Sequence, residues 1–404
     1  MFKAYKYRLY PSDRQKEILS KHFGGCRFVW NHFLDLRSKQ YAETGKGMTY
    51  NRMSLELKKL KHDGDHAWLG ETNSQSLQQV LMHLDTAYTR FFNDLGEFPV
   101  FKHKSGRQSF TVPQRFRVEG NKLFIPNVGG IRLFMHRAYE GDIRNVTISK
   151  NPSGKYYASL MVQLDNVAMQ PEDINANSAV SIDVGLKAFA TLSNGLQIAN
   201  PKYLKRAEKQ LKKAQRSLAR KKKGSKNRRE ARVVVARAEE HVANQRRDFH
   251  DKVSDALLNA YDTIIVEDLN VSGMMLNHKL AQAIADVGWS SFITMLKTKA
   301  LQRGKSVIEI GRFQPSSKMC SRCGNIKRDL KLSDRIYHCN VCGLTIDRDL
   351  NAAINIKRFG MISVDVPTDS GEFTPVDRGA TTLFQLEREG IVQVHWLKQE
   401  AYVL

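Results

Sequence analysis

Long apolar runs are absent from this 404-residue sequence: no stretch of 18 apolar residues occurs, and the beginning of the chain has no signal-peptide pattern. These absences argue against a membrane-spanning helix and against secretion. Cysteine is also scarce, and four of the five cysteines fall within 23 positions. A clustered set with one residue left over fits a metal site in a reducing compartment better than a disulfide framework. We therefore expect a cytoplasmic protein.

Acidic residues are few in comparison with basic ones. The chain has 64 Lys and Arg against 41 Asp and Glu, a net charge of +23. Residues 361–404 contain seven acidic and three basic residues, a net charge of −4, which leaves +27 on residues 1–360. Such an excess indicates a polyanionic partner, either nucleic acid or an anionic membrane. Without a membrane-binding segment, nucleic acid is the expected partner.

The first 170 residues predict a helical domain inserted into a small antiparallel β-barrel. Residues 12–106 repeat apolar positions at helical spacing, with Ser12 as a candidate N-cap. Residues 1–11 and 107–170 contain strand-like segments, and glycine turns such as Gly129-Gly130 separate them. The strand at the start of the chain is expected to join the barrel.

The second half predicts alternating strands and helices over residues 179–315 and 344–360. Within it, residues 202–252 predict a long helical hairpin that turns at Gly224-Ser225. Residues 202–232 contain fifteen Lys or Arg and two Glu. A run of charged residues is often only the solvated face of a helix. Here, however, the excess of positive side chains repels itself without an anionic partner. The candidates for nucleic-acid backbone contact are Lys221, Lys222, Lys223, Arg228 and Arg229.

The cysteine spacing is Cys320-x2-Cys323-x15-Cys339-x2-Cys342. Two such pairs present four thiolates that can converge on one Zn²⁺ ion in tetrahedral geometry. Four protein ligands close the coordination shell, so this zinc is predicted to be structural, within a ribbon at residues 316–343. The fifth cysteine, Cys26, is expected to be a packed core thiol.

Three carboxylates stand at the ends of expected elements. Asp183 and Glu267 each follow an apolar strand, and Asp349 lies where it could cap the next helix, with Asp347 as a possible substitute. Singly, each would be a surface acid or a cap. Together, carboxylates from separate elements supply the oxygen ligands that Mg²⁺ prefers. Two such ions about 4 Å apart can hydrolyse a phosphodiester.

Several motifs together resemble the TnpB proteins of bacterial and archaeal insertion sequences, which are compact relatives of type V CRISPR effectors. The motifs with catalytic or metal-binding residues are Ile182-Asp-Val-Gly185, Ile265-Val-Glu-Asp-Leu269, the paired cysteines and Asp347-Arg-Asp-x-Asn-Ala-Ala-x-Asn-Ile356. Further matches are Tyr7-Arg-Leu-Tyr-Pro11, Arg27-Phe-Val-Trp-Asn31 and Asp286-Val-Gly-Trp289. The resemblance covers residues 1–360 in order and does not extend to the tail.

The resemblance implies an α+β multidomain protein. The barrel would be the wedge domain, residues 12–106 the inserted recognition lobe, and the rest a RuvC-like RNase H fold with the inserted zinc ribbon. It implies one guide RNA from the transposon end, a double-stranded DNA target, and Mg²⁺-dependent cleavage of both strands beside a short transposon-adjacent motif. The catalytic acids of the family carry over to Asp183, Glu267 and Asp349, which would bind two Mg²⁺ ions.

The family recognises its adjacent DNA motif mainly with the recognition lobe. Polar residues on the expected helices of that lobe are Tyr50, Ser54, Gln75 and Gln78. Glutamine suits adenine edges in the major groove, and apolar atoms suit the thymine methyl. The alternative is that these are solvated positions on amphipathic helices.

Three other functions stay open on the sequence: a transposase, an RNA-guided repressor without nuclease activity, and a plain zinc-ribbon nucleic-acid-binding protein. The acidic tail, residues 361–404, is expected to be disordered and dispensable. Its segments 383–386 and 391–397 are apolar enough to pack against the body instead.

Overall fold

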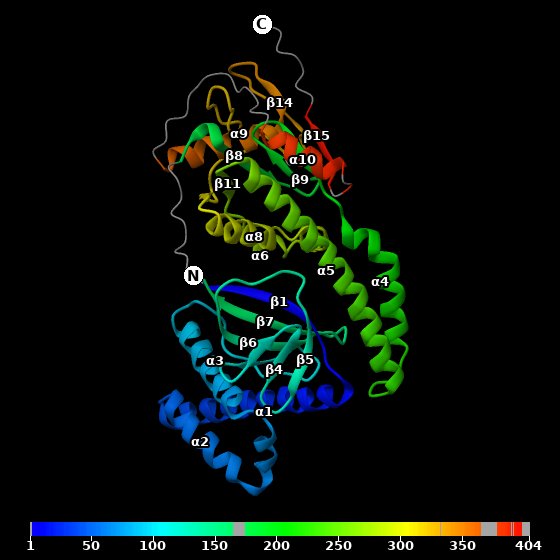
Figure 1. Cartoon of the computed structure of the whole chain (residues 1–404). Helices are drawn as coiled ribbons and strands as arrows, with labels where there is room; N and C mark the ends of the chain where they lie inside the picture. Colours follow the sequence, from blue (N-terminus) through cyan, green and yellow to red (C-terminus); the bar gives the residue numbers. More distant parts are fainter. Residues whose placement is uncertain are drawn as a thin grey trace. The chain divides into compact units, whose positions relative to one another are not determined.

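The computed structural model describes residues 2–164, 174–331, 333–364, 378–388, 390 and 392–397. The chain forms two compact units (Figure 1). One contains Met1–Val167 and Leu218–Arg237, and the other contains Ala168–Ser217 and Ala238–Leu404. Within the described residues, no helix is both long and apolar enough to cross a membrane.

The first unit contains a seven-stranded antiparallel sheet in the order β2-β6-β7-β1-β5-β4-β3. The strand at the start of the chain, β1 (Phe2–Tyr10), lies inside this sheet between β7 (Tyr156–Gln163) and β5 (Gly129–Phe134). The other strands are β2 (Gln108–Val112), β3 (Arg117–Glu119), β4 (Lys122–Ile125) and β6 (Asp142–Lys150). In the described residues β2 and β3 are the two edge strands of the sheet, and they do not pair with each other. The prediction of a small barrel is therefore corrected to a curled, open half-barrel.

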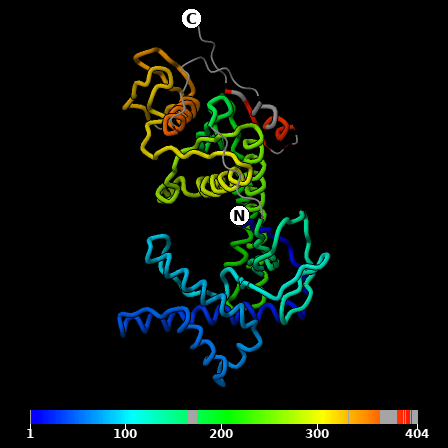
Figure 2. Tube along the Cα trace, turned by 60° about the vertical axis from the view of Figure 1, so that its left-hand side comes forward, coloured from blue at the N-terminus to red at the C-terminus, as the bar shows by residue number. Residues whose placement is uncertain are grey.

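Helices inserted between β1 and β2 pack on this sheet. They are α1 (Asp13–Thr44), α2 (Tyr50–His62), the 3₁₀ helix η1 (Gly64–Glu71) and α3 (Ser74–Phe92), in the blue half of Figure 2. Ser12 caps α1 in a capping box with Gln15. The apolar stripe of α3 is buried, and it shares one core with α1 and the strands. Burial of that stripe therefore fixes the inserted helices to the sheet.

The second unit contains a six-stranded sheet in the order β12-β11-β8-β9-β10-β15. Its strands are β8 (Ala179–Val184), β9 (Ala188–Leu192), β10 (Leu196–Ala199), β11 (Thr263–Glu267), β12 (Ser306–Ile310) and β15 (Val394–Trp396). Strands β8 and β9 form an antiparallel hairpin, and β8, β11 and β12 run parallel. The apolar run of β11 is buried because helices cover both faces of the sheet.

Different helices cover the two faces. Ile264 and Val266 of β11 pack with residues of α5 (Lys226–Ala260), α7 (Ala281–Val287) and α8 (Trp289–Gln302). Ile265 faces the other side and packs against α9 (Arg348–Ile362). There Gly360 permits a close approach, since a Cβ atom at this position would lie 2.4 Å from Cγ2 of Ile265. The parallel strands thus lie between two helical layers. The short α6 (Val271–Met274) follows β11.

The expectation of a disordered tail is wrong for the residues that the structure describes there. Residues Arg378–Arg388 form α10, and β15 pairs antiparallel with β10, with Leu196 opposite Trp396. Leu383, Val392 and Val394 are buried in the core of the second unit. The physical reason is that β10 would otherwise be an unpaired sheet edge, which β15 covers. Residues 365–377 and 398–404 of the tail lie outside the described residues.

Candidate nuclease site and metal centre

The structure brings the three predicted acids to one end of the parallel strands. Asp183 is the fifth residue of β8 and Glu267 is the last residue of β11. These strands run parallel with Ile182 opposite Val266, so the two acids that follow this pair lie at the same level. Asp349 is in the first turn of α9, which packs on β8. A parallel register thus places residues 84 positions apart side by side.

Burial and neighbouring negative charges act together on the acids of this cluster. The pKa of Asp183 is raised well above its usual value, first by burial and then by the nearby charges of Glu267 and Asp349. Burial also raises the pKa of Glu267, against a hydrogen bond that lowers it. Arg348 donates from Nη2 to Oδ1 of Asp349 over 2.9 Å. The cluster therefore favours uptake of a cation, either a proton or a metal ion.

The helix-capping role that the sequence suggested for Asp349 belongs to Asp347 in the structure. Asp347, not Asp349, is the N-cap of α9: its Oδ1 accepts hydrogen bonds from the backbone N–H of Asp349 at 2.9 Å and of Leu350 at 3.1 Å. The reason is spacing, because a cap side chain must reach back to amides two and three residues later. Oδ1 of Asp347 is therefore engaged by the helix, which leaves Asp349 as the acid of this pair without a capping role.

Sequence reasoning missed a buried serine that holds one of the acids. Ser316, which is 7% exposed, donates from Oγ to Oε1 of Glu267 over 2.6 Å. The backbone oxygen of Ser316 accepts from Nδ2 of Asn355 at 2.8 Å. No sequence pattern marks Ser316, because its partner lies 49 positions away.

Two asparagines of α9 connect the same region to the first cysteine pair. Asn351 and Asn355 are fully buried, and both donate from Nδ2 to the backbone oxygen of Met319, at 2.7 and 2.6 Å. Oδ1 of Asn351 accepts from the backbone N–H of Ser321, between Cys320 and Cys323. Both asparagines belong to the motif at residues 347–356, and their four-residue spacing puts them on one helix face. That four-residue spacing is the sequence signal from which the shared position of the two asparagines could have been predicted.

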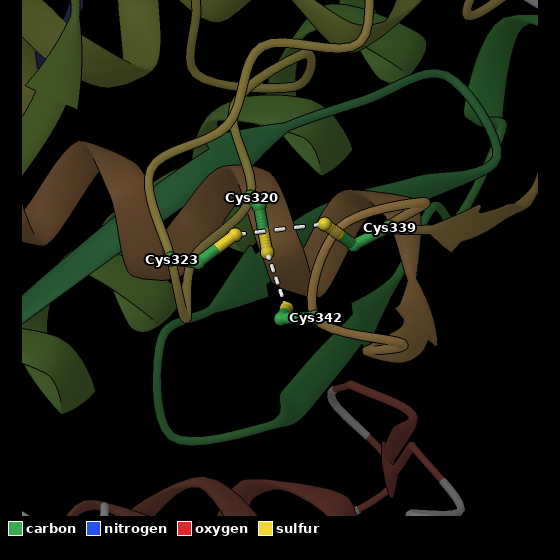
Figure 3. A group of neighbouring side chains, drawn as sticks. All are labelled: Cys320, Cys323, Cys339 and Cys342. Carbon is green, nitrogen blue, oxygen red and sulfur yellow. Dashed lines mark hydrogen bonds between the residues drawn. The ribbon is translucent and has the colours of Figure 1, made fainter.

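The four predicted zinc ligands lie together at one site (Figure 3). Cys320 and Cys342 have their Sγ atoms 3.6 Å apart, as do Cys323 and Cys339. All four Sγ atoms lie within 4.8 Å of one another, which holds for no other group of three or more His, Cys, Asp or Glu among the described residues. A tetrahedral Zn²⁺ with bonds of about 2.3 Å separates its sulfur ligands by roughly 3.8 Å. The cluster therefore fits one structural zinc.

The scaffold around the cysteines is small and well packed. Strands β13 (Ile336–His338) and β14 (Thr345–Asp347) form a hairpin, and buried Tyr337 packs with Cys320 and Cys339. Its hydroxyl donates to the backbone oxygens of Lys318 and Asn325. The remaining cysteine, Cys26, lies in the core of the first unit, where burial raises the pKa of its thiol to about 12. It is thus the core thiol that was expected.

The basic candidates lie around the turn between α4 (Tyr203–Ala219) and α5, where Gly224 adopts a φ of 84°. Lys221, Lys222, Lys223 and Arg229 are exposed. Arg228 differs from them, because its Nη1 donates to the backbone oxygens of Leu218 at 2.9 Å and Lys221 at 2.8 Å. Its guanidinium closes the C-terminal end of α4. The predicted contact of Arg228 with a nucleic-acid phosphate stays a prediction, and in this structure its Nη1 is engaged with the backbone.

The four candidates for DNA-motif recognition divide between two helices. Tyr50 and Ser54 lie on α2 and are half-buried, whereas Gln75 and Gln78 lie on α3. Gln75 donates from Nε2 to Oε1 of Gln114, and its own Oε1 is buried without a partner in the described structure. Gln78 is exposed. The helices are neighbours, but this arrangement does not test a role in recognition.

Comparisons with known proteins find family matches in three segments of the chain. Residues 159–278 match a family described as "Probable transposase", residues 289–356 match the "Cas12f1-like, TNB domain", and residues 1–46 match a "Helix-turn-helix domain". In the structure the last of these segments consists of β1 and the single long α1.

Two curated relatives align over most of both chains. A Streptomyces pristinaespiralis protein is 35% identical over 89% of this chain and 89% of its own length. A relative from Escherichia coli, InsQ, is 32% identical over 88% of this chain and 92% of its own. Both names contain "Putative RNA-guided DNA endonuclease". Among solved structures, a Cas12f1–sgRNA–target DNA complex aligns at 13% identity with a TM-score of 0.47, over 88% of this chain and 98% of that chain.

Fold and site together define a mixed α/β protein with a half-barrel sheet, a strand-end carboxylate cluster and a four-cysteine centre of the TNB type. The family follows from the sequence identity to these relatives and from the share of both chains that aligns. The chain belongs to the TnpB family of insertion-sequence-encoded proteins.

Proposed function

We propose that the protein is an RNA-guided endonuclease that cuts both strands of DNA at one Mg²⁺-dependent site of RuvC type. The observation that carries this proposal is the placement of Asp183, Glu267 and Asp349 at one end of the parallel strands. Burial, followed by the nearby charges of Glu267 and Asp349, raises the pKa of Asp183 and supports a cluster suited to a divalent cation. A sheet of parallel and antiparallel strands between helical layers supports an RNase H-like fold for this unit.

The three carboxylates fit magnesium by donor type, since this ion prefers oxygen ligands. Bound Mg²⁺ would activate a water molecule and stabilise the leaving oxygen. The residues of the chain prepare the site: Ser316 holds Oε1 of Glu267, and Asp347 fixes the first turn of α9, which presents Asp349. Arg348 donates a hydrogen bond to Oδ1 of Asp349, and this hydrogen bond must weaken when the carboxylate binds an ion.

The proposed partners follow from charge and family. The net charge of +23 supports a large phosphate-bearing ligand. We propose a guide RNA from the transposon end, with one protein per guide RNA, and a DNA target beside a short adjacent motif. Lys221, Lys222, Lys223 and Arg229 are the proposed backbone contacts, and Tyr50, Ser54, Gln75 and Gln78 remain the candidates for motif recognition.

The test is cleavage with matched binding. Protein purified with its RNA is incubated with a plasmid that contains the matching target and adjacent motif, with and without Mg²⁺. Linear product is expected only with Mg²⁺ and only from the matched plasmid. Binding without cleavage by the unaltered protein would favour a repressor. Joining of transposon-end DNA without RNA would favour the transposase alternative.

A further inference from the structure

A cavity of about 600 Å³ lies in the first unit, between α1 and the end of η1. On α1 it is lined by one helix face that includes Lys21, Gly24, Arg27 and Phe28, and on η1 by Trp68 and Glu71. Part of this face is the motif Arg27-Phe-Val-Trp-Asn31, which matches the family but has no place in the proposed cleavage reaction. A volume of this size is typical of ligand sites.

Aromatic rings form the apolar wall of the cavity. The ring of Phe28 meets Trp68 edge to face, with centroids 5.2 Å apart, and stacks against His32 at 5.6 Å. Trp68 is 43% exposed although it is a large aromatic residue. Burial and the neighbouring His66 lower the pKa of His32, so its ring is neutral at pH 7. The wall therefore offers flat uncharged surfaces that the chain itself leaves open to solvent.

Charged groups surround these rings. Lys21 pairs with Glu71 at 2.5 Å, and both side chains are more than half exposed. An exposed pair of this kind contributes little stability, so a ligand can separate it at low cost. Arg27 donates from Nη1 to Oε1 of Gln108 over 2.8 Å, which fixes the position of the guanidinium. The cavity thus combines two cations with one carboxylate acceptor.

Two neighbouring glycines show how the hollow is made. A Cβ atom at Gly24 would meet no atom within 4 Å, because the residue borders the open cavity. A Cβ atom at Gly25 would lie 2.5 Å from Oγ1 of Thr72, so Gly25 lets α1 pack closely against the residue after η1. The glycine at 24 keeps the cavity open, and the glycine at 25 keeps the two elements together.

We propose that this cavity binds one unstacked nucleobase of a single-stranded nucleic acid segment, and this inference rests on the proposed nucleic-acid partner. The base would stack on the exposed ring of Trp68, with Phe28 supporting that ring edge to face, as bases stack on aromatic platforms. Lys21 and Arg27 would contact the adjoining phosphates. Glu71 would accept a hydrogen bond from an exocyclic amine, which favours cytosine, adenine or guanine over uracil or thymine.

A nucleobase explains the residues that line the cavity better than a peptide side chain does. A peptide-binding apolar site does not need two cations at its rim, whereas a nucleotide brings its phosphate with its base. The chain as a whole carries +23, which attracts polyanions to the protein. Flat neutral rings next to cations are the combination that single-strand binders use.

The test uses the protein with its copurified RNA, irradiated at 254 nm before digestion and mass spectrometry, with and without target DNA. A nucleotide adduct is expected on the peptide with Phe28 or the peptide with Trp68. Its mass identifies the base and tells RNA from DNA. In Gly24→Leu, which fills the hollow, this adduct should disappear. Ala42→Leu, at an exposed position of the same helix, is the matched control.

A second measurement does not depend on photochemistry. The exchange of bound RNA, or of bound target DNA, against labelled competitor should accelerate about 5- to 150-fold in Gly24→Leu, the range expected for loss of one stacked base. Ala42→Leu should exchange like the unaltered protein. Equal exchange in both variants, for RNA and for DNA, would overturn the pocket and leave the proposed nuclease intact. Protein that retains no RNA at all would instead overturn the proposed function.

Discussion

The two candidate metal centres of the second unit are built in opposite ways. The four cysteines lie within 23 positions, and their sulfur atoms already converge to within 4.8 Å. The three acids span residues 183–349, and the register of β8 with β11 and the packing of α9 on β8 bring them together. Thiolates that converge on a closed site stabilise the fold, whereas a buried carboxylate beside two further acids favours uptake of a cation. Substitutions should therefore separate a centre that stabilises from a centre that acts.

The largest expected effect is loss of cleavage in Asp183→Asn. The amide removes a magnesium ligand, so guided cleavage should fall to background while RNA and DNA binding persist. In contrast to cleavage, the thermal stability of the protein should increase. The native pKa of Asp183 lies above its unfolded value, so the native state binds the extra proton and stability falls as pH rises between the two values. At neutral pH and without Mg²⁺, the neutral amide should therefore raise the melting temperature.

The measurements are a plasmid cleavage time course and melting curves in EDTA at pH 5 and pH 7.5. The gain in melting temperature should be larger at pH 7.5. A variant that cuts normally would remove Asp183 from the site, and one that melts well below the unaltered protein would make it a structural residue.

The four-cysteine centre should show the reverse pattern. Cys320→Ser removes one of four thiolates, and a closed zinc site contributes to the folding free energy. The melting temperature and the zinc content should both fall, and cleavage should be lost because the ribbon no longer supports α9 through Asn351. Zinc content is measured by atomic absorption, with one ion per chain expected in the unaltered protein. Cys26→Ser is the control and should retain its zinc.

Much of this contrast could be predicted from the sequence, but only where the determining contacts are local or follow a regular period. Cysteine spacing is local, and apolar runs that end in Asp183 and Glu267 mark buried strands. The choice between Asp347 and Asp349 depends on which carboxylate reaches the helix amides, and that requires backbone geometry. Ser316 is defined by a contact across 49 positions and has no pattern of its own. The open edge of the half-barrel is likewise a property of the assembled sheet.

The tail provides a test of long-range assembly in the sheet that carries the acids. Truncation after Val364 removes Leu383, Val392 and Val394, whose full burial is worth roughly 5–9 kcal/mol as an upper limit. It also exposes the edge of β10. The melting temperature should fall by several degrees, and the protein should aggregate more readily. Melting curves and light scattering measure this, and an unchanged melting temperature would restore the view that the tail is dispensable.

A smaller effect is expected where the two centres meet, at Ser316. Alanine there removes the hydrogen bond to Glu267, and loss of such a supporting contact typically costs roughly 10- to 100-fold in metal affinity or activity. The Mg²⁺ concentration for half-maximal cleavage should rise, and stabilisation of the protein by Mg²⁺ should weaken. Ser316→Thr keeps the hydroxyl and should recover most of both. Equal losses in the two variants would point to packing of Ser316 instead.

The smallest expected effect distinguishes two adjacent arginines of the hairpin. Arg229 is exposed, and its proposed role is contact with one phosphate, so Arg229→Gln should flatten the log–log salt slope of duplex binding by about 0.9 with no change in melting temperature. Arg228 holds the backbone oxygens of Leu218 and Lys221, so Arg228→Gln should loosen the turn and leave the slope nearly unchanged. Filter binding from 50 to 300 mM salt measures the slope, and amide exchange at residues 218–228 reports the turn. If Arg228→Gln flattens the slope as much as Arg229→Gln does, its guanidinium leaves the turn to bind nucleic acid, and its role is then the one predicted from charge alone.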